Sequence, residues 1–308
     1  MGSREALLQV EDVDWNMALA QFKVNGFVVF DNMLSTERVD AMHAAFSVLL
    51  DKLRKRDGDT PLVEDKNGTL VPEPAVAKLG EHGDIRTGNG RLQQINRYTC
   101  NVPWVQPFAD REVYEHPVIL EFLQRYWGDT DFRISCYHSN TPVPGSQYQH
   151  WHRDANTHGI DRGGNVTMQN CPHFGIKIPL VDTTEENGSF EVLPGSQYLN
   201  EFPAEAGMTW DDVLNAHGRT VHHSFAQTRR LNLKKGSMWV QDPRALHRGT
   251  PNTSGAARPE LVICYTRNFW QATRRPLDIS PREWKDLQPS ARGLKMLEWT
   301  QPVQPARL

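Results

Sequence analysis

Short β-rich runs separated by turn residues dominate the second half of this 308-residue chain. Branched and aromatic residues recur within the runs, and Gly, Pro, Asn or Asp stand between them. Regularly punctuated short strands of this kind are typical of a β-sandwich or a β-barrel. The sequence therefore predicts a mainly β jelly roll, with strands at Phe132–Asn140, Gly175–Asp182, Ser189–Leu193, Ser237–Gln241 and Leu261–Arg267.

The first half of the chain is predicted to be mainly helical and to pack outside the jelly roll. Apolar residues recur at helical spacing over Val13–Lys23 and again after Ser35, which is a suitable N-cap. Pro117 and Gly128 suit the two ends of a third helix, and Phe27–Phe30 is typical of a buried strand. We predict one domain over 1–308, with a helical part at about 10–128, a jelly-roll core at about 129–275 and a C-terminal extension at 276–308.

The segment 56–90 shows no apolar periodicity and is rich in turn residues. A structureless segment of this length is uncommon in a compact domain and is often a lid or a binding loop. A surface segment without fixed structure is the alternative, and the sequence does not decide between the two.

Composition and charge exclude several classes of partner. A net charge of -3 gives no electrostatic footprint for nucleic acid, and no apolar run reaches the ~18 residues that a membrane span needs. The first residues lack the apolar core of a signal peptide, and the four cysteines have no paired spacing. We therefore expect a cytoplasmic protein that acts on a small molecule, and nothing in the sequence excludes a homodimer.

The chemistry of the chain is indicated by His152 and Asp154, together with the distant His247. Residues i and i+2 of an extended strand point to the same face, so His152 and Asp154 can aim an imidazole and a carboxylate at one point. A second imidazole from His247 completes a 2-His-1-carboxylate set, which holds Fe(II) and leaves positions open for a cosubstrate and O2. These three residues are the predicted metal ligands and the core of the predicted catalytic site.

Other histidines compete for the same role. His150 shares the predicted strand face with His152 and is the nearest rival, whereas a cluster at His217, His222 and His223 has no carboxylate at suitable spacing. A structural zinc site is disfavoured, because such sites are closed by four ligands and favour cysteine. Two further histidines, His158 and His173, flank a glycine-rich segment and are placed by the sequence at a pocket entrance.

Arg258 lies eleven residues after His247, at the start of another β-rich run. A guanidinium at that point can bind a carboxylate through two parallel hydrogen bonds. The alternative is an arginine exposed in a loop.

These motifs together resemble the phytanoyl-CoA dioxygenase family of Fe(II)/2-oxoglutarate oxygenases over about 25–267. The matching elements are Asn25-Gly26-Phe27 with the helix that follows, the His152-Arg153-Asp154 motif, Glu186-Asn187-Gly188-Ser189 with Leu193-Pro194-Gly195-Ser196, and His247 with Arg258. The resemblance implies a double-stranded β-helix (jelly roll, cupin-like fold), with Fe(II), 2-oxoglutarate as cosubstrate, and O2.

The resemblance also implies roles for residues around the cosubstrate. Arg258 is expected to hold its far carboxylate, and Gln149 matches a glutamine that touches the cosubstrate in some members. Gly249 stands where many members have a serine, for which Thr250 is a candidate substitute. Lys177 replaces a frequent inward-facing aromatic residue, so it either contacts the cosubstrate or an anionic substrate or faces outward.

The predicted reaction is oxidation, most simply hydroxylation, of a small polar metabolite or natural-product intermediate, with succinate and CO2 as co-products. Candidate substrate contacts are Arg97, Gln94, Trp151 and Arg267. Two other functions stay open. One is a cupin-type isomerase or another metal enzyme that does not use 2-oxoglutarate, and the other is a non-catalytic protein that binds a metabolite in the same fold.

Overall fold

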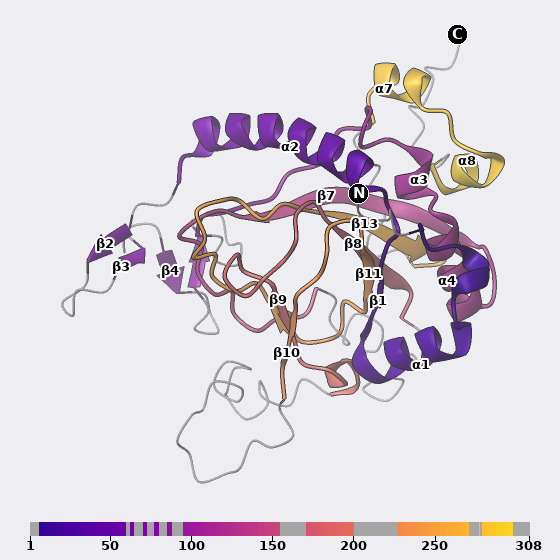
Figure 1. The fold of residues 1–308 in the computed structure, drawn as a ribbon, viewed down its shortest axis with the longest axis horizontal. Helices are drawn as coiled ribbons and strands as arrows, with labels where there is room; N and C mark the ends of the chain where they lie inside the picture. Colours follow the sequence, from indigo (N-terminus) through magenta and orange to yellow (C-terminus); the bar gives the residue numbers. More distant parts are fainter. Residues whose placement is uncertain are drawn as a thin grey trace.

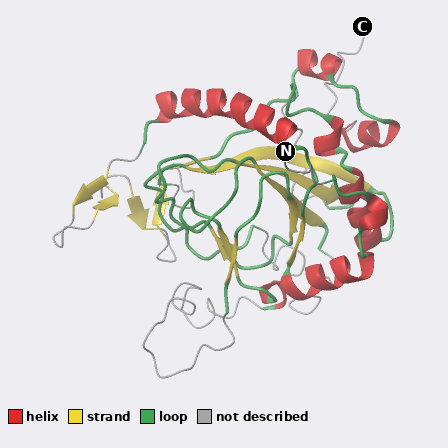
Figure 2. Ribbon diagram, viewed as in Figure 1, coloured by secondary structure: helices red, strands yellow, loops and turns green. Residues whose placement is uncertain are grey.

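The computed structural model describes residues 6–59, 95–154, 171–199, 227–270, 277 and 279–297 (Figure 1). Between 62 and 87 it describes only the backbone of four short strands. Within this part of the chain, strands form the centre of the molecule and helices lie around them (Figure 2). No described helix combines the length and the apolar character that crossing a membrane requires.

The core is a six-stranded antiparallel sheet in the order β1-β11-β8-β13-β7-β6. A smaller sheet, in the order β10-β9-β12, faces it, so the predicted jelly roll is confirmed. The strands of the main sheet, in this order, are Phe27–Phe30, Met238–Gln241, His173–Pro179, Glu260–Arg267, Phe132–Pro142 and Arg97–Tyr98. Those of the smaller sheet are Arg229–Leu231, Phe190–Val192 and His247–Arg248.

Strand register brings polar side chains into rows on the inner face of the main sheet. Lys177 of β8 lies opposite Trp239 on one side and Val262 on the other, and Val262 in turn lies opposite His138 of β7. Because successive residues alternate between faces, every second residue of these strands points into the space between the sheets. This arrangement forms the wall of the site described below.

Helices cover the outside of the main sheet. They are α1 (Trp15–Asn25), α2 (Thr36–Asp57), α3 (Arg111–Tyr114) and α4 (Pro117–Trp127), with a 3-10 turn η1 (Val10–Asp12) before α1. Ser35 caps α2 as predicted, by accepting from the Arg38 backbone N–H, and Gly128 ends α4 with φ at 83°. A left-handed residue at a helix end favours glycine, which explains this position.

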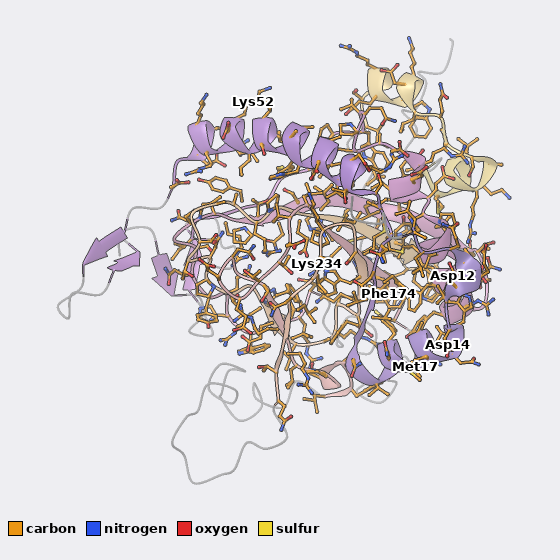
Figure 3. The ribbon with its side chains drawn as sticks, in the orientation of Figure 1. Asp12, Asp14, Met17, Lys52, Phe174 and Lys234 are labelled. Atoms are coloured by element: carbon orange, nitrogen blue, oxygen red, sulfur yellow. The ribbon has the colours of Figure 1, made fainter. Side chains whose placement is uncertain are left out.

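Aromatic side chains join the helices to the sheet. Phe22 of α1 packs edge-to-face on Phe122 and Tyr126 of α4 and on Phe174 of β8, with ring centroids 5.0 to 5.3 Å apart. Phe174 lies inside the molecule, whereas Lys52 points outward from α2 (Figure 3). Such geometry adds to the hydrophobic stabilisation that burial itself provides.

One segment differs from the sequence prediction, and another has helices for which the sequence analysis made no prediction. The region 56–90 is not structureless, because its backbone forms two short hairpins, β2–β3 (Leu62–Glu64 and Leu70–Pro72) and β4–β5 (Ala77–Leu79 and Ile85–Thr87). The C-terminal extension holds α7 (Pro281–Asp286) and α8 (Ala291–Leu297). It is fastened to the helical part where Trp104 N–H donates to Glu283 and Ser290 N–H donates to Glu115.

Candidate metal centre

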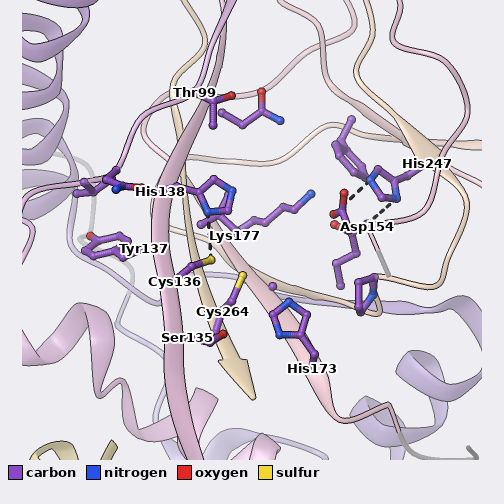
Figure 4. A pocket seen from close by; sticks show the side chains of 18 of the residues that line it. Thr99, Ser135, Cys136, Tyr137, His138, Asp154, His173, Lys177, His247 and Cys264 are labelled. Atoms are coloured by element: carbon purple, nitrogen blue, oxygen red, sulfur yellow. Dashed lines mark hydrogen bonds and ion pairs between the residues drawn. The ribbon is translucent and has the colours of Figure 1, made fainter. Parts of the chain in front are cut away.

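His152, Asp154 and His247, here called the triad, meet at one point in the structure. A backbone bridge holds the two histidines, since each donates its amide N–H to the carbonyl of the other at 3.0 Å. Asp154 Oδ2 lies 3.4 Å from His247 Nε2, and its Oδ1 lies 3.7 Å from His152 Nε2 (Figure 4). All three ligand atoms lie within 4.8 Å of one another, so one metal ion can contact all of them.

The hydrogen bonds of the two imidazoles prepare them as ligands. His152 Nδ1 lies 2.7 Å from the carbonyl of His150, and His247 Nδ1 lies 2.8 Å from that of Ala245. A carbonyl oxygen only accepts, so Nδ1 of His152 carries the proton and its Nε2 keeps its lone pair for a metal. His247 Nδ1 also lies 2.8 Å from the side-chain amide of Gln241, so two groups hold this ring in place. Fixing the tautomer through the other ring nitrogen is how proteins orient metal-binding histidines.

Electrostatics keep His152 and Asp154 in the protonation states that metal binding needs. Burial, and after it the charge of His247, lower the pKa of His152 to about 4, so its imidazole is neutral at pH 7. Burial raises the pKa of the Asp154 carboxyl, but His247 and His152 outweigh this effect and hold its pKa well below the usual range. The Asp154 side chain is 50% exposed, which leaves one side of the triad open.

The open side faces a cavity of about 800 Å³ enclosed by both sheets. Its wall includes the triad together with polar side chains from β7, β8 and the segment before β7. These are Thr99, Asn101, Ser135, His138, Asn140, His173 and Lys177, with Phe190 and Val262 among the apolar residues. A cavity of this size suits a small molecule.

Arg258 is buried with only 1% of its surface exposed, so it is not the loop arginine of the alternative prediction. None of its three guanidinium nitrogens has a hydrogen-bond partner within the described chain, and the nearest carboxylate, Glu260 Oε1, lies 3.7 Å from Nη1. A buried charge without hydrogen bonds is costly. The site therefore fits a carboxylate ligand, although Arg258 is not among the residues that line the cavity.

Arg97 is a second buried arginine in this region. Its Nη2 donates to the Thr250 carbonyl at 3.1 Å, while its Nη1 has no partner in the described residues. Burial, and after it the charge of Arg258, lower the pKa of Arg97 to about 9. A Cβ at Gly249 would lie 2.5 Å from Arg97 Cζ, so the guanidinium fills the space that a serine would need.

Gln149 and Thr250 are both neighbours of Gly249, but only Gln149 lines the cavity. Gln149 lines the cavity, and its Oε1 accepts from the Gly249 N–H at 2.8 Å. The Thr250 hydroxyl donates to the Ser189 carbonyl and accepts from Arg230, and Thr250 does not line the cavity. Its position does not support the role of a serine substitute, because both functions of its hydroxyl are occupied.

Lys177 faces inward, which decides between the two alternatives for its direction. Its Nζ lies 3.8 Å from the ring centroid of Phe190 and 4.7 Å from that of Trp239. Burial lowers the pKa of Lys177, and the carboxylates of Glu260 and Asp154 oppose this effect. The ammonium group thus adds positive charge to the cavity beside the triad.

Two other predicted substrate contacts, Trp151 and Arg267, do not reach the cavity. Trp151 does not line it, and neither does Arg267, whose guanidinium pairs with Asp129 at 2.7 Å. Arg153 lines it but donates to the backbone carbonyls of Ser196, Leu199 and Arg244, so it fastens a loop rather than serving a substrate. The positions of Trp151 and Arg267 do not support substrate binding. Gln94, His158 and the His217, His222 and His223 cluster lie outside the described residues.

Sequence reasoning missed one further group of polar residues in the cavity wall. Cys136 and His138 of β7 and Cys264 of β13, here called the thiol cluster, place their Sγ and ring nitrogen atoms within 4.8 Å of one another. The buried Glu260 was missed as well, and it accepts from Trp239 Nε1 at 3.2 Å. The sequence signal that could have identified these residues is the recurrence of polar residues at every second position along otherwise apolar strands.

Comparisons with known proteins agree with the fold and the triad. The sequence profile of the phytanoyl-CoA dioxygenase (PhyH) family matches residues 22–259. Dioxygenase aneA of Aspergillus aculeatus is 25% identical over 71% of this chain and 69% of its own length. L-proline trans-4-hydroxylase of Streptomyces griseoviridis is 31% identical over 38% of this chain, and this match spans about half (47%) of the relative.

A solved structure shows the same fold. The non-heme alpha-ketoglutarate-dependent carbocyclase SnoK from nogalamycin biosynthesis superposes with a TM-score of 0.54 at 16% identity, over 85% of this chain and 87% of that one. The family match covers most of the chain and contains all three triad residues and Arg258. The chain belongs to the phytanoyl-CoA dioxygenase family and is a non-haem Fe(II)/2-oxoglutarate-dependent dioxygenase.

Proposed function

We propose that this enzyme oxidises, by hydroxylation in the simplest case, a small polar metabolite or natural-product intermediate. The observation that carries the proposal is the convergence of the triad on an enclosed, mainly polar cavity, close to a buried arginine that makes no hydrogen bond within the described residues. The triad suits Fe(II) with open coordination positions, and the buried arginine suits a dicarboxylate cosubstrate.

Each residue of the triad has a defined part in this function. His152 and His247 would hold Fe(II) through Nε2, and Asp154 through a carboxylate oxygen. When bound, iron and 2-oxoglutarate supply the oxidation of a substrate C–H bond by O2, with succinate and CO2 as co-products. The backbone bridge between the two histidines keeps their rings in place, and the half-exposed Asp154 leaves the cavity side accessible.

Arg258 would bind the far carboxylate of 2-oxoglutarate. Its planar fork matches a carboxylate with two parallel hydrogen bonds. Arg97 lies in the same buried region and has a free Nη1 within the described chain, so we assign it to the cosubstrate rather than to the substrate. An enzyme that did not use 2-oxoglutarate would leave the buried guanidinium of Arg258 without a hydrogen-bond partner among the described residues.

The wall of the cavity supports a polar substrate. Asn101, Asn140 and Thr99 offer amide and hydroxyl groups, and Lys177 offers a positive charge near the triad. An acyl chain would leave these groups without partners, which costs about 1 to 3 kcal/mol for each one. Among the relatives, one is named as a hydroxylase of L-proline and one belongs to nogalamycin biosynthesis, and both names agree with a small-molecule substrate.

The test is oxygen-dependent turnover of 2-oxoglutarate. Purified enzyme with Fe(II) is expected to release succinate under O2 and none without it, with a rate that rises when the correct metabolite from a polar library is added. Asp154→Ala is expected to lose this activity, whereas Asp129→Ala, which alters a surface ion pair outside the cavity, retains it. Succinate release by Asp154→Ala at the wild-type rate would reject the assignment.

A further inference from the structure

The thiol cluster has the composition and spacing of a second metal site. Cys136 and Cys264 lie directly opposite each other on the neighbouring strands β7 and β13, and His138 follows Cys136 on the same face. His138 Nδ1 lies 3.3 Å from Cys136 Sγ, and Cys136 and Cys264 are both free thiols. Figure 4 shows the three side chains together, with Lys177 extending between them and the triad.

These distances suit a tetrahedral metal ion. Zinc binds sulfur at about 2.3 Å and imidazole nitrogen at about 2.0 Å, so a sulfur and a nitrogen on one ion lie roughly 3.5 Å apart. The observed 3.3 Å between Nδ1 and Sγ is close to this value, and all three ligand atoms lie within 4.8 Å. Only small side-chain adjustments would therefore bring them around one ion.

The ligand types separate this cluster from the triad. Thiolates are soft ligands that select Zn(II) and Cu(I), whereas imidazole with carboxylate suits Fe(II). Two thiolates and one neutral imidazole balance the charge of a divalent cation, which makes burial of the ion less costly. Because Cys136, His138 and Cys264 all line the cavity, a fourth ligand such as water can approach from the cavity side.

We propose that Cys136, His138 and Cys264 bind Zn(II) in the wall of the cavity. The site is separate from the triad in residues and in chemistry, and the proposal does not depend on the substrate class proposed above. It also predicts that the enzyme holds two metal ions of different kinds in one cavity, with Lys177 between them.

Cobalt titration tests the proposal, because Co(II) bound to thiolate has an intense charge-transfer absorption in the near ultraviolet that Co(II) bound to imidazole and carboxylate lacks. Reduced, metal-free enzyme is expected to show this band and to lose it when Zn(II) is added; because the triad also binds Co(II), saturation with one ion per chain is measured in Asp154→Ala. Asp154→Ala, which disables the triad, is expected to keep the band. Failure of the proposed reaction would therefore leave this result unchanged.

Single variants of the cluster complete the experiment. Cys264→Ser and Cys136→Ser are each expected to abolish the band, and His138→Gln to weaken cobalt binding at least tenfold. Cys100→Ser is the matched control, since Cys100 lies outside the cluster and beside Ser139, and it is expected to retain the band. Should Cys264→Ser fail to fold, Cys136→Ser decides, because Cys136 is only partly buried.

Three results would overturn the proposal. One is the absence of the band in the reduced wild-type enzyme. Another is its persistence in a folded Cys136→Ser or Cys264→Ser variant. The third is a Cys136–Cys264 disulfide that persists in the enzyme prepared for the titration, so that thiol-specific reagents label neither sulfur.

Discussion

The two clusters that line the cavity are held by different kinds of structure. The triad comes from the loop segment that holds His152 and Asp154 and from the short strand β12, which meet through the His152–His247 bridge. The thiol cluster sits on β7 and β13, adjacent strands in the interior of the main sheet. Strand register fixes the positions of the thiol cluster. The triad instead depends on two segments that are distant in sequence and meet in the fold.

This difference has a chemical counterpart. Asp154 is half exposed and its neighbours are loops, so the triad can accept small molecules from the cavity. Cys264 is buried at 6% exposure within a continuous strand, which leaves less freedom to rearrange. The comparison teaches that one cavity can combine an open site for iron with a more rigid site of softer ligands.

The largest expected effect comes from removing one triad imidazole. His247→Ala removes a metal ligand itself. It should therefore weaken Fe(II) binding by more than the ~10- to 100-fold that follows from losing a residue that only hydrogen-bonds a ligand. Iron retained after equilibrium dialysis measures this effect. Cys264→Ser should retain iron at the wild-type affinity, and a parallel loss in that variant would show that the two clusters are not independent.

The sequence predicted the triad because its chemistry follows from spacing. His152 and Asp154 stand two residues apart, and the family motif locates His247 far downstream. Most of the longer strands of the jelly roll were also predicted to within a few residues, since apolar runs and turn residues mark them, whereas the short strands β6, β10 and β12 were not predicted. Branched and aromatic residues in β7, β8 and β13 fit a pleated, buried surface wherever the strands pair.

The thiol cluster could not be predicted in the same way, because its members meet only through strand register. Cys136 and Cys264 lie far apart in sequence, and their pairing depends on β13 lying between β7 and β8. A shift of one residue would turn Cys264 to the other face of the sheet. The role of Arg97 was equally hidden, since nothing in its neighbourhood in the sequence indicates burial beside Arg258.

The next largest effect concerns the cosubstrate. Arg258→Lys keeps the charge but removes the planar fork, so the Kd for 2-oxoglutarate should rise about 10- to 100-fold, the equivalent of one charge-assisted hydrogen bond or two. Isothermal titration of the metal-loaded enzyme measures it. Arg267→Lys, in a surface ion pair, is the matched control, and equal affinities in the two variants would contradict the role of Arg258.

A smaller effect, on stability, is expected at Gly249, where the Arg97 guanidinium packs against the backbone. Because a Cβ at this position would lie 2.5 Å from Arg97 Cζ, Gly249→Ala should lower the free energy of unfolding by about 1 to 3 kcal/mol, the usual cost of overpacking. Urea denaturation of this variant, of Arg97→Ala and of the double variant gives the coupling between the two positions. Strictly additive changes would show that the guanidinium does not occupy the space beside Gly249.

The smallest expected effect tests the connection between the two clusters. Lys177→Met keeps an unbranched side chain against Phe190 and Trp239 but removes a buried charge, so stability should stay unchanged or rise slightly. The affinity for 2-oxoglutarate should fall about fivefold, since a positive charge several ångströms from an anion contributes about 1 kcal/mol in a partly solvated cavity. Lys234→Met, at an exposed lysine paired with Asp182, is the control. If Lys177→Met binds 2-oxoglutarate as tightly as the wild type, the lysine packs between the aromatic rings and does not contribute to cosubstrate binding.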